Sequence, residues 1–184
     1  MKVKGSALRS TMNFLREHYP PPAIERILNG LPEEDRKILT PPILVSSWFP
    51  AETLCRLAHA LEKETAGDPE ELFLRLGKQS CEDGLNTIYR IFFQVGTPSF
   101  IIKRVTQVWS NYYDAGKMVL VSSTSNTVHV RLEGAHLPDS AMCTRITGWM
   151  IRSLELSGGR RIALEHTSCI HRGGHDCEWK ADWD

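Results

Sequence analysis

The residues best suited to chemistry lie near the C-terminus, where three cysteines and a histidine occur as Cys143, His166, Cys169 and Cys177. Their spacing is Cys-x22-His-x2-Cys-x7-Cys. Three thiolates and one imidazole are a complete tetrahedral ligand set for zinc, and a fully ligated ion keeps no position for water or substrate. These residues therefore predict a metal that stabilises the fold rather than one that performs catalysis.

Other interpretations of the same residues stay open. Cys169 and Cys177 could form a disulfide across a hairpin, or the cysteines could be unrelated small buried side chains. The odd total of five cysteines and the lack of a signal peptide favour free thiols in a reducing compartment. His171 and His175 lie in the same loop, so either could replace His166 as the fourth ligand.

The elements that must position these ligands are a helix and a hairpin. Gly173 and Gly174 suit the tip of a hairpin whose strands are residues 160–166 and 176–182. A helix from Pro138 to about Ser157, closed by a Gly-Gly pair, would bring Cys143 to that hairpin. Alternating apolar residues predict two earlier strands, at residues 117–123 and 127–133. Zinc would then staple the helix to the sheet.

The first two thirds of the chain are predicted to be helical. Apolar residues recur there at helical spacing, and prolines and glycines separate the segments. One short extended piece is expected at residues 43–45. The expected helices start at Gly5, just before Ile24, at Pro32, at Pro50, at Pro69 and at Pro98, and the fifth of them runs to about Val95. The sequence thus predicts an α+β fold in which an N-terminal helical layer packs on a small C-terminal antiparallel sheet with one inserted helix.

Composition narrows the class of protein. A length of 184 residues suits a single domain over residues 1–184. Lys and Arg balance Asp and Glu at 22 each, so no overall basic field favours nucleic acid. No apolar stretch reaches the roughly 20 residues of a membrane span. We therefore expect a cytoplasmic protein.

The central helices carry a series of aromatic side chains that suits a small-molecule pocket. Trp109 and Tyr112 lie one helical turn apart, and Phe93 precedes them as a further wall. The alternative is that all three simply fill the core. The sequence has no nucleotide-binding, nucleophile-elbow or metalloprotease motif, so the chain is not expected to be an enzyme.

Residues 4–7, 13–17, 46–50 and 109–116 and the closing Cys169 to Trp179 resemble an uncharacterised paralogous family of myxobacteria, and this similarity covers nearly the whole chain. The last third, with its Cys-x7-Cys hairpin, resembles the 4-vinyl-reductase domain. More remotely, the chain resembles the fold of haem–nitric-oxide sensors and of transport-protein-particle components.

The resemblance implies a ligand-binding fold that often dimerises through its helices. Phenol-sensing regulators use a related domain with a zinc site, whose three cysteines correspond to Cys143, Cys169 and Cys177, and His166 stands where those regulators have glutamate. Haem is not expected, because haem sensors need a histidine on a central helix and none lies between His59 and His129.

Three functions compete at this point. The leading one is a stand-alone sensor that binds a small hydrophobic or aromatic ligand, with a structural zinc and a homodimeric assembly. The DNA-binding and ATPase modules of the phenol regulators are missing, so a signal would pass to a separate partner. The second function is a protein-interaction or scaffold module of the transport-particle type. The third is an accessory subunit of a reductase.

Overall fold

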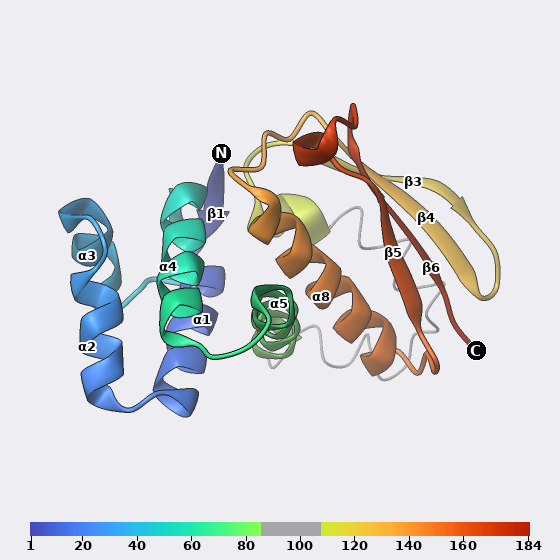
Figure 1. Cartoon of the computed structure of the whole chain (residues 1–184). Coiled ribbons are helices and arrows are strands. Elements are labelled where there is room, and N and C mark those ends of the chain that lie inside the picture. Colours follow the sequence, from blue (N-terminus) through green and yellow to red (C-terminus); the bar gives the residue numbers. More distant parts are fainter. Residues whose placement is uncertain (86–107) are drawn as a thin grey trace.

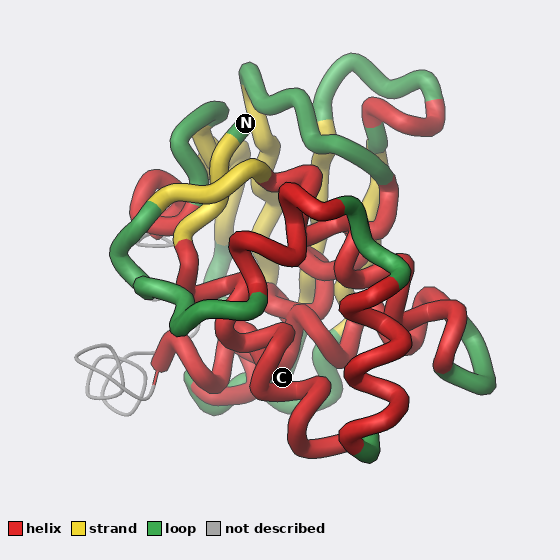
Figure 2. The backbone as a smooth tube through the Cα atoms, turned by 90° about the vertical axis from the view of Figure 1, so that its left-hand side faces the viewer, coloured by secondary structure: helices red, strands yellow, loops and turns green. Residues whose placement is uncertain are grey.

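The computed structural model describes residues 1–85 and 108–184, and it confirms the α+β class. Helices form one layer and a small sheet the other, and the long helix α8 lies against the sheet (Figure 1). Viewed from the helical side, the helices cover much of the sheet (Figure 2). Among the described residues, no helix is both long and apolar enough to cross a membrane.

The helices begin and end close to the predicted proline and glycine positions. Asp68 accepts a hydrogen bond from the backbone N–H of Glu70 and so caps the helix that starts at Pro69. The predicted helix from Thr97-Pro98, and the part of its predecessor beyond Leu85, lie outside the described residues. The described helices are α1 (Gly5–His18), α2 (Pro21–Asn29), α3 (Glu33–Leu39), α4 (Ala51–Glu64), α5 (Pro69–Leu85), α8 (Ser140–Leu156) and the short 3-10 helix η1 (Ile170–Arg172).

The sheet is antiparallel throughout and has the strand order β3-β4-β6-β5. The predicted pairs 117–123 with 127–133 and 160–166 with 176–182 are both confirmed, with small shifts at the ends. In β4, Val128, Val130 and Leu132 face the core while the residues between them are only half covered. The strands are β3 (Lys117–Ser123), β4 (Thr127–Glu133), β5 (Ala163–Ser168) and β6 (Cys177–Asp182).

A second, two-stranded sheet of β1 (Lys2–Lys4) and β2 (Trp48–Pro50) corrects one prediction. The extended piece expected at residues 43–45 is not a strand; the strand starts at Trp48 instead. The carbonyls of Val45 and Ser47 accept hydrogen bonds from the first N–H groups of α1, which need partners outside the helix. This segment therefore caps α1 rather than pairing as a strand.

Helices α5 and α8 cross at very close range because each has a glycine at the contact. A Cβ on Gly77 would lie 2.0 Å from the carbonyl oxygen of Arg145, and one on Gly148 would lie 2.1 Å from that of Leu74. No larger residue fits at either position without moving a backbone. The two glycines thus fix the distance between α5 and α8, and both helices line the same apolar cavity.

Candidate metal centre and ligand chamber

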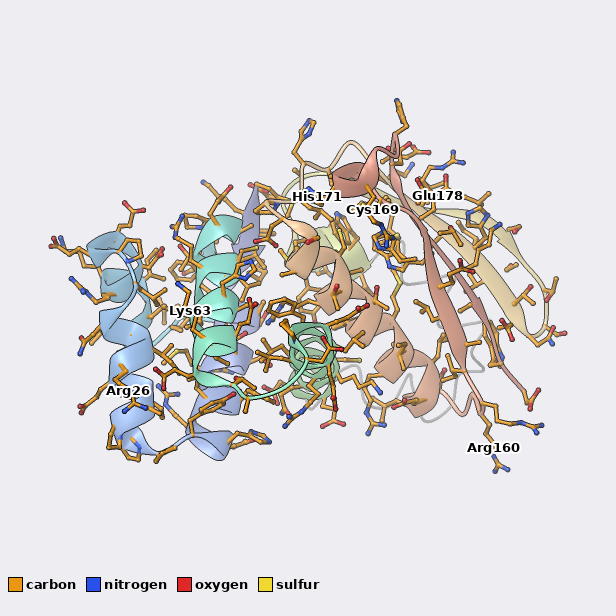
Figure 3. All side chains as sticks on the ribbon, viewed as in Figure 1. Arg26, Lys63, Arg160, Cys169, His171 and Glu178 are labelled. Carbon is orange, nitrogen blue, oxygen red and sulfur yellow. The ribbon has the colours of Figure 1, made fainter. Side chains whose placement is uncertain are left out.

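The predicted metal ligands converge at one end of the sheet. Cys143 comes from the first turn of α8, His166 from β5, Cys169 from the residue before η1, and Cys177 from the start of β6. One ligand atom from each of the four residues lies within 4.8 Å of all the others. Figure 3 shows Cys169 at this end of the hairpin, opposite Arg160.

The sulfur spacing matches a tetrahedral zinc site. The Sγ atom of Cys143 lies 3.9 Å from that of Cys169 and 3.8 Å from that of Cys177. With a Zn–S bond of about 2.3 Å, tetrahedral geometry places two sulfur atoms about 3.8 Å apart. A disulfide needs about 2.05 Å, and all five cysteines are free. The arrangement is therefore that of thiols around a shared point.

The imidazole of His166, the fourth predicted ligand, points to the same place as the three thiols. Within the described part of the chain, Nε2 of His166 is buried and has no hydrogen-bond partner. A buried ring nitrogen without a partner costs free energy unless something else binds it. His171 and His175 are exposed, and the four-residue cluster does not include them. The structure thus places His166, and neither of its neighbours in the loop, beside the three thiols.

A second layer of contacts fixes the imidazole and the helix. The ring of His166 stacks on that of Trp179, with centroids 4.6 Å apart and an angle of 7° between the planes. The indole N–H of Trp179 donates to Thr147 Oγ1, and that hydroxyl donates to the carbonyl of Cys143. Such outer contacts orient metal ligands in known sites. Here they tie β6 to α8 one turn beyond Cys143.

The loop between Cys169 and Cys177 is too tight for ordinary side chains. Gly173 has φ +84°, and a Cβ on Gly174 would lie 2.4 Å from Ser168 Oγ. The carbonyl of Cys169 accepts hydrogen bonds from the N–H groups of Arg172 and Gly174. These turns return the chain so that both cysteines face the same point.

Protons are shared unevenly among the thiols. Its contact with the Cys177 sulfur, together with burial, raises the pKa of Cys143. The same contact, and the nearby His166, lower the pKa of Cys177. A lowered thiol pKa supplies the thiolate that a metal ion needs, because metals bind the deprotonated form.

An apolar chamber lies between the helical layer and the sheet. Its volume is about 50 Å³, enough for a few water molecules. The walls come from α1, α5, α8, β3 and the helical residues 108–112. Six of the side chains that line it are large: Trp109, Tyr112, Tyr113, Met118, Trp149 and Met150.

Trp109 and Tyr112, predicted to share a pocket, both line this chamber, while Phe93 lies outside the described residues. The indole N–H of Trp109 donates to the carbonyl of Ala115, and its ring stacks on Tyr113 with centroids 4.0 Å apart. Burial raises the pKa of Tyr113 to about 12, so its phenol stays neutral. Trp109 is thus held firmly in place as one wall.

A polar cleft of about 220 Å³, which the sequence did not predict, opens beside the chamber. Ser80 and Tyr112 line both cavities. Among the described residues, Ser10 Oγ and Asp83 Oδ2 are buried without a hydrogen-bond partner, and both residues line the cleft. Ser10 follows the buried residues Ala7 and Leu8 of α1, and a serine on a buried stripe was the one available signal.

No protein-family model matches this chain, and no curated protein matches it. Its fold is that of H-NOX proteins. The structural match to an H-NOX protein from K. algicida covers 98% of this chain and 96% of that protein. The sequence identity is 13% and the TM-score is 0.75. For S. oneidensis H-NOX structures in the Fe(II)NO and Fe(II)CO states, the coverage is 98% of this chain and 99% and 98% of those chains. Their identities are 10% and 11%, each with TM-score 0.76.

The comparison contradicts the expectation of no haem. Other matching structures concern haem redox potential under porphyrin distortion and haem distortion in the H-NOX family, so the matched fold is one that holds haem. The exclusion relied on the lack of a histidine between His59 and His129. Haem iron is also held by tyrosine, methionine or cysteine in other proteins, so a missing histidine is no ground for excluding haem.

The chamber allows a test of fit. Tyr113, Met118 and Met150 line it, and their residue types ligate haem iron elsewhere. As these side chains lie, a volume of about 50 Å³ does not fit a porphyrin.

Proposed function

We propose that residues 1–184 act as one ligand-binding domain, a small-molecule sensor in which zinc bound by Cys143, His166, Cys169 and Cys177 holds the hairpin to α8. The observation that supports this function best is the aromatic chamber at the junction of helices and sheet, in a fold shared with H-NOX proteins. Ligand sites are mostly apolar cavities with a few polar groups. The chamber and its polar cleft have that composition.

The metal centre and the chamber share α8. Cys143 lies in the first turn of this helix, and Ile146, Trp149 and Met150 follow on the face that lines the chamber. A zinc ion bound at Cys143 would therefore fix the wall of the chamber as well as the hairpin. The role of zinc in this proposal is structural, because all four of its positions are taken by protein ligands.

We also propose that the protein is a cytoplasmic homodimer that passes its signal to a separate protein. Leu44 and Val45, together with Trp48 at the start of β2, are exposed apolar residues close together in the chain and provide a candidate contact for a second copy. We also propose that the chain is related to the uncharacterised myxobacterial family and the 4-vinyl-reductase domain, on the strength of its Cys-x7-Cys hairpin.

Native mass spectrometry tests the sensor function. The wild-type chain is expected to carry one zinc ion and to bind a small aromatic compound. Ile146→Phe, which adds bulk to the chamber, should lose the organic mass and keep the zinc. Val121→Phe is the matched control, because Val121 is exposed on the sheet and should change neither.

Retained zinc together with a cooperative unfolding transition shows that the Ile146→Phe variant is folded. Binding of the organic compound by that variant with unchanged affinity would contradict the proposed chamber. So would a wild-type chain that binds no small aromatic compound at all.

A further inference from the structure

The polar cleft beside the chamber contains two buried polar atoms that lack a hydrogen-bond partner in the part of the chain that the structure describes. Ser10 is 2% exposed, and its hydroxyl oxygen has no hydrogen-bond partner among the described residues. In Asp83, Oδ1 accepts a hydrogen bond from Gln79 at 2.9 Å, while Oδ2 is buried and accepts none from the described part of the chain. Unpartnered buried polar atoms cost free energy, and in native proteins they commonly mark a place for water, an ion or a ligand.

The two atoms need a donor. An aspartate carboxylate only accepts hydrogen bonds, and a serine hydroxyl accepts as well as donates. A charged N–H donor forms the strongest bond with a carboxylate, and a buried carboxylate gains most from such a partner. The chemistry of the pair therefore fits the ammonium group of an amine better than an anion or a neutral acceptor.

The position of the cleft adds the second half of the ligand. Ser80 and Tyr112 line both cavities, so the polar cleft continues into the apolar chamber. A molecule with its polar group between Ser10 and Asp83 would direct its apolar part past Tyr112 towards Trp149. The ring centroids of Tyr112 and Trp149 lie 6.3 Å apart. Met118 and Met150 also line the chamber, and flexible methionine side chains adjust to admit a ring.

One basic residue lies on the same cleft and must be weighed. Arg9 lines the cleft, but this residue is exposed. Within the described ranges, no ion pair joins Arg9 to Asp83. An exposed guanidinium is screened by water, whereas Asp83 Oδ2 is not. The Asp83 carboxylate, with its buried Oδ2, is therefore the stronger determinant of charge preference.

We infer that the cleft and chamber together bind a small aromatic amine, with the ammonium group at Asp83 and Ser10 and the ring in the chamber. This inference rests on the proposed sensor function and specifies its ligand class. Tyr112 lies at the passage between the two cavities and positions the bound molecule. Its hydroxyl oxygen would lie 2.7 Å from a Cβ at Gly84, so a larger residue there would narrow the passage.

Three probes of nearly equal size separate the possibilities by calorimetric titration at pH 7. They are 2-phenylethylamine, 2-phenylethanol and phenylacetate, which carry a cationic, a neutral and an anionic head on the same ring. The wild-type protein is expected to bind the amine about tenfold or more tightly than the alcohol, as a charge-assisted hydrogen bond predicts. Phenylacetate should bind most weakly.

Variants locate the preference. Asp83→Asn should reduce the amine's advantage to less than about threefold and leave the alcohol's affinity unchanged. Glu17→Gln, an equal change of charge at an exposed residue of α1, is the matched control and should keep the full advantage. Gly84→Ala should weaken the amine and the alcohol together, because it narrows the passage that both use.

Each outcome decides the inference. Equal affinity for amine and alcohol, tightest binding of phenylacetate, or an undiminished preference in Asp83→Asn would overturn the amine class while the sensor function stands. Failure of all three probes to bind would overturn both the inference and the proposed chamber. An amine preference that disappears only in Asp83→Asn supports the inference.

Discussion

The metal centre and the polar cleft beside the chamber both contain buried polar atoms that find no partner among residues 1–85 and 108–184, but the atoms are arranged differently. At the metal centre, the nitrogen of His166 and three sulfur atoms point to one place within 4.8 Å of each other. On the polar cleft beside the chamber, the unpartnered atoms of the described residues Ser10 and Asp83 come from two different helices, α1 and α5. Convergence on a point suits a single ion, and dispersion around a cavity suits a molecule with separate polar and apolar parts.

The first way to test that contrast is to remove one thiol. Cys177→Ser should abolish stoichiometric zinc and lower the free energy of unfolding by about 4 kcal/mol, the chain-entropy value for releasing a closed loop of this length, here residues 143 to 177. Chemical denaturation and metal analysis measure both effects. His175→Ala is the matched control, because this side chain is 98% exposed and outside the cluster. Equal zinc in the two variants would show that Cys177 is not a ligand.

A smaller loss is expected where the helices around the chamber meet. Gly148→Ala places a methyl group 2.1 Å from the backbone oxygen of Leu74, which has no room to yield. The expected cost is about 3 kcal/mol, measured by denaturant titration. In the control Gly30→Ala, the nearest atom is 3.4 Å away, so the change should stay within about 0.5 kcal/mol. Similar values for the two variants would contradict the close crossing of α5 and α8.

Arg145 should respond in the opposite direction. Its side chain donates one hydrogen bond to Thr11, but Nη1 has no partner among the described residues and the residue is 5% exposed. Burial lowers the pKa of Arg145, because the charged form is poorly solvated there. Arg145→Met keeps most of the volume and removes the charge, and it should raise the free energy of unfolding by about 2 kcal/mol.

A melting temperature below that of the wild type would show that Arg145 has a stabilising partner. Arg152→Met is the comparison, because Arg152 is paired with Glu82 and Glu155 and should not gain stability.

The smallest effect concerns pH. Burial acts to lower the pKa of His59, but hydrogen bonds to Glu62 and Asp139 outweigh it, so the pKa is raised from the ordinary 6.5. The protonated His59 therefore stabilises the folded state. This contribution to the free energy of unfolding is complete below pH 6.5 and is lost as the pH rises through the folded-state pKa. Because the side chain is 44% exposed, solvent screening keeps it below about 1 kcal/mol. The difference in melting temperature between wild type and His59→Gln should shrink from pH 6.5 to pH 8.5, and a constant difference would contradict this account.

The sequence predicted the two regions unequally, for a physical reason. Cysteine and histidine are rare and chemically specific, so the spacing of Cys169 and Cys177 after a helical Cys143 was enough to expect the cluster. The choice of His166 over His171 and His175 needed the register of β5 against β6. The strands β1 and β2 have three residues each, and their pairing comes from tertiary contacts that local patterns do not contain.

The cleft was missed because its residues have ordinary surface chemistry. Asp83 lies in a helix where an acidic residue is expected to be solvated, and only packing against its neighbours removes Oδ2 from water. Trp109 and Tyr112 do line one cavity, since aromatic residues one turn apart share a helix face, and their role in binding a ligand stays a prediction. The exclusion of haem failed because it considered one residue type where several can serve.

X-ray absorption at the zinc edge, on protein purified without chelator, tests the central claim most directly. The account predicts one zinc ion per chain, with three sulfur neighbours at about 2.3 Å and one nitrogen at about 2.0 Å. It also predicts that the signal of the imidazole nitrogen is lost in His166→Ala, while His171→Ala leaves the spectrum unchanged. Protein that contains no zinc, or in which Cys169 and Cys177 are joined by a disulfide, would contradict the account.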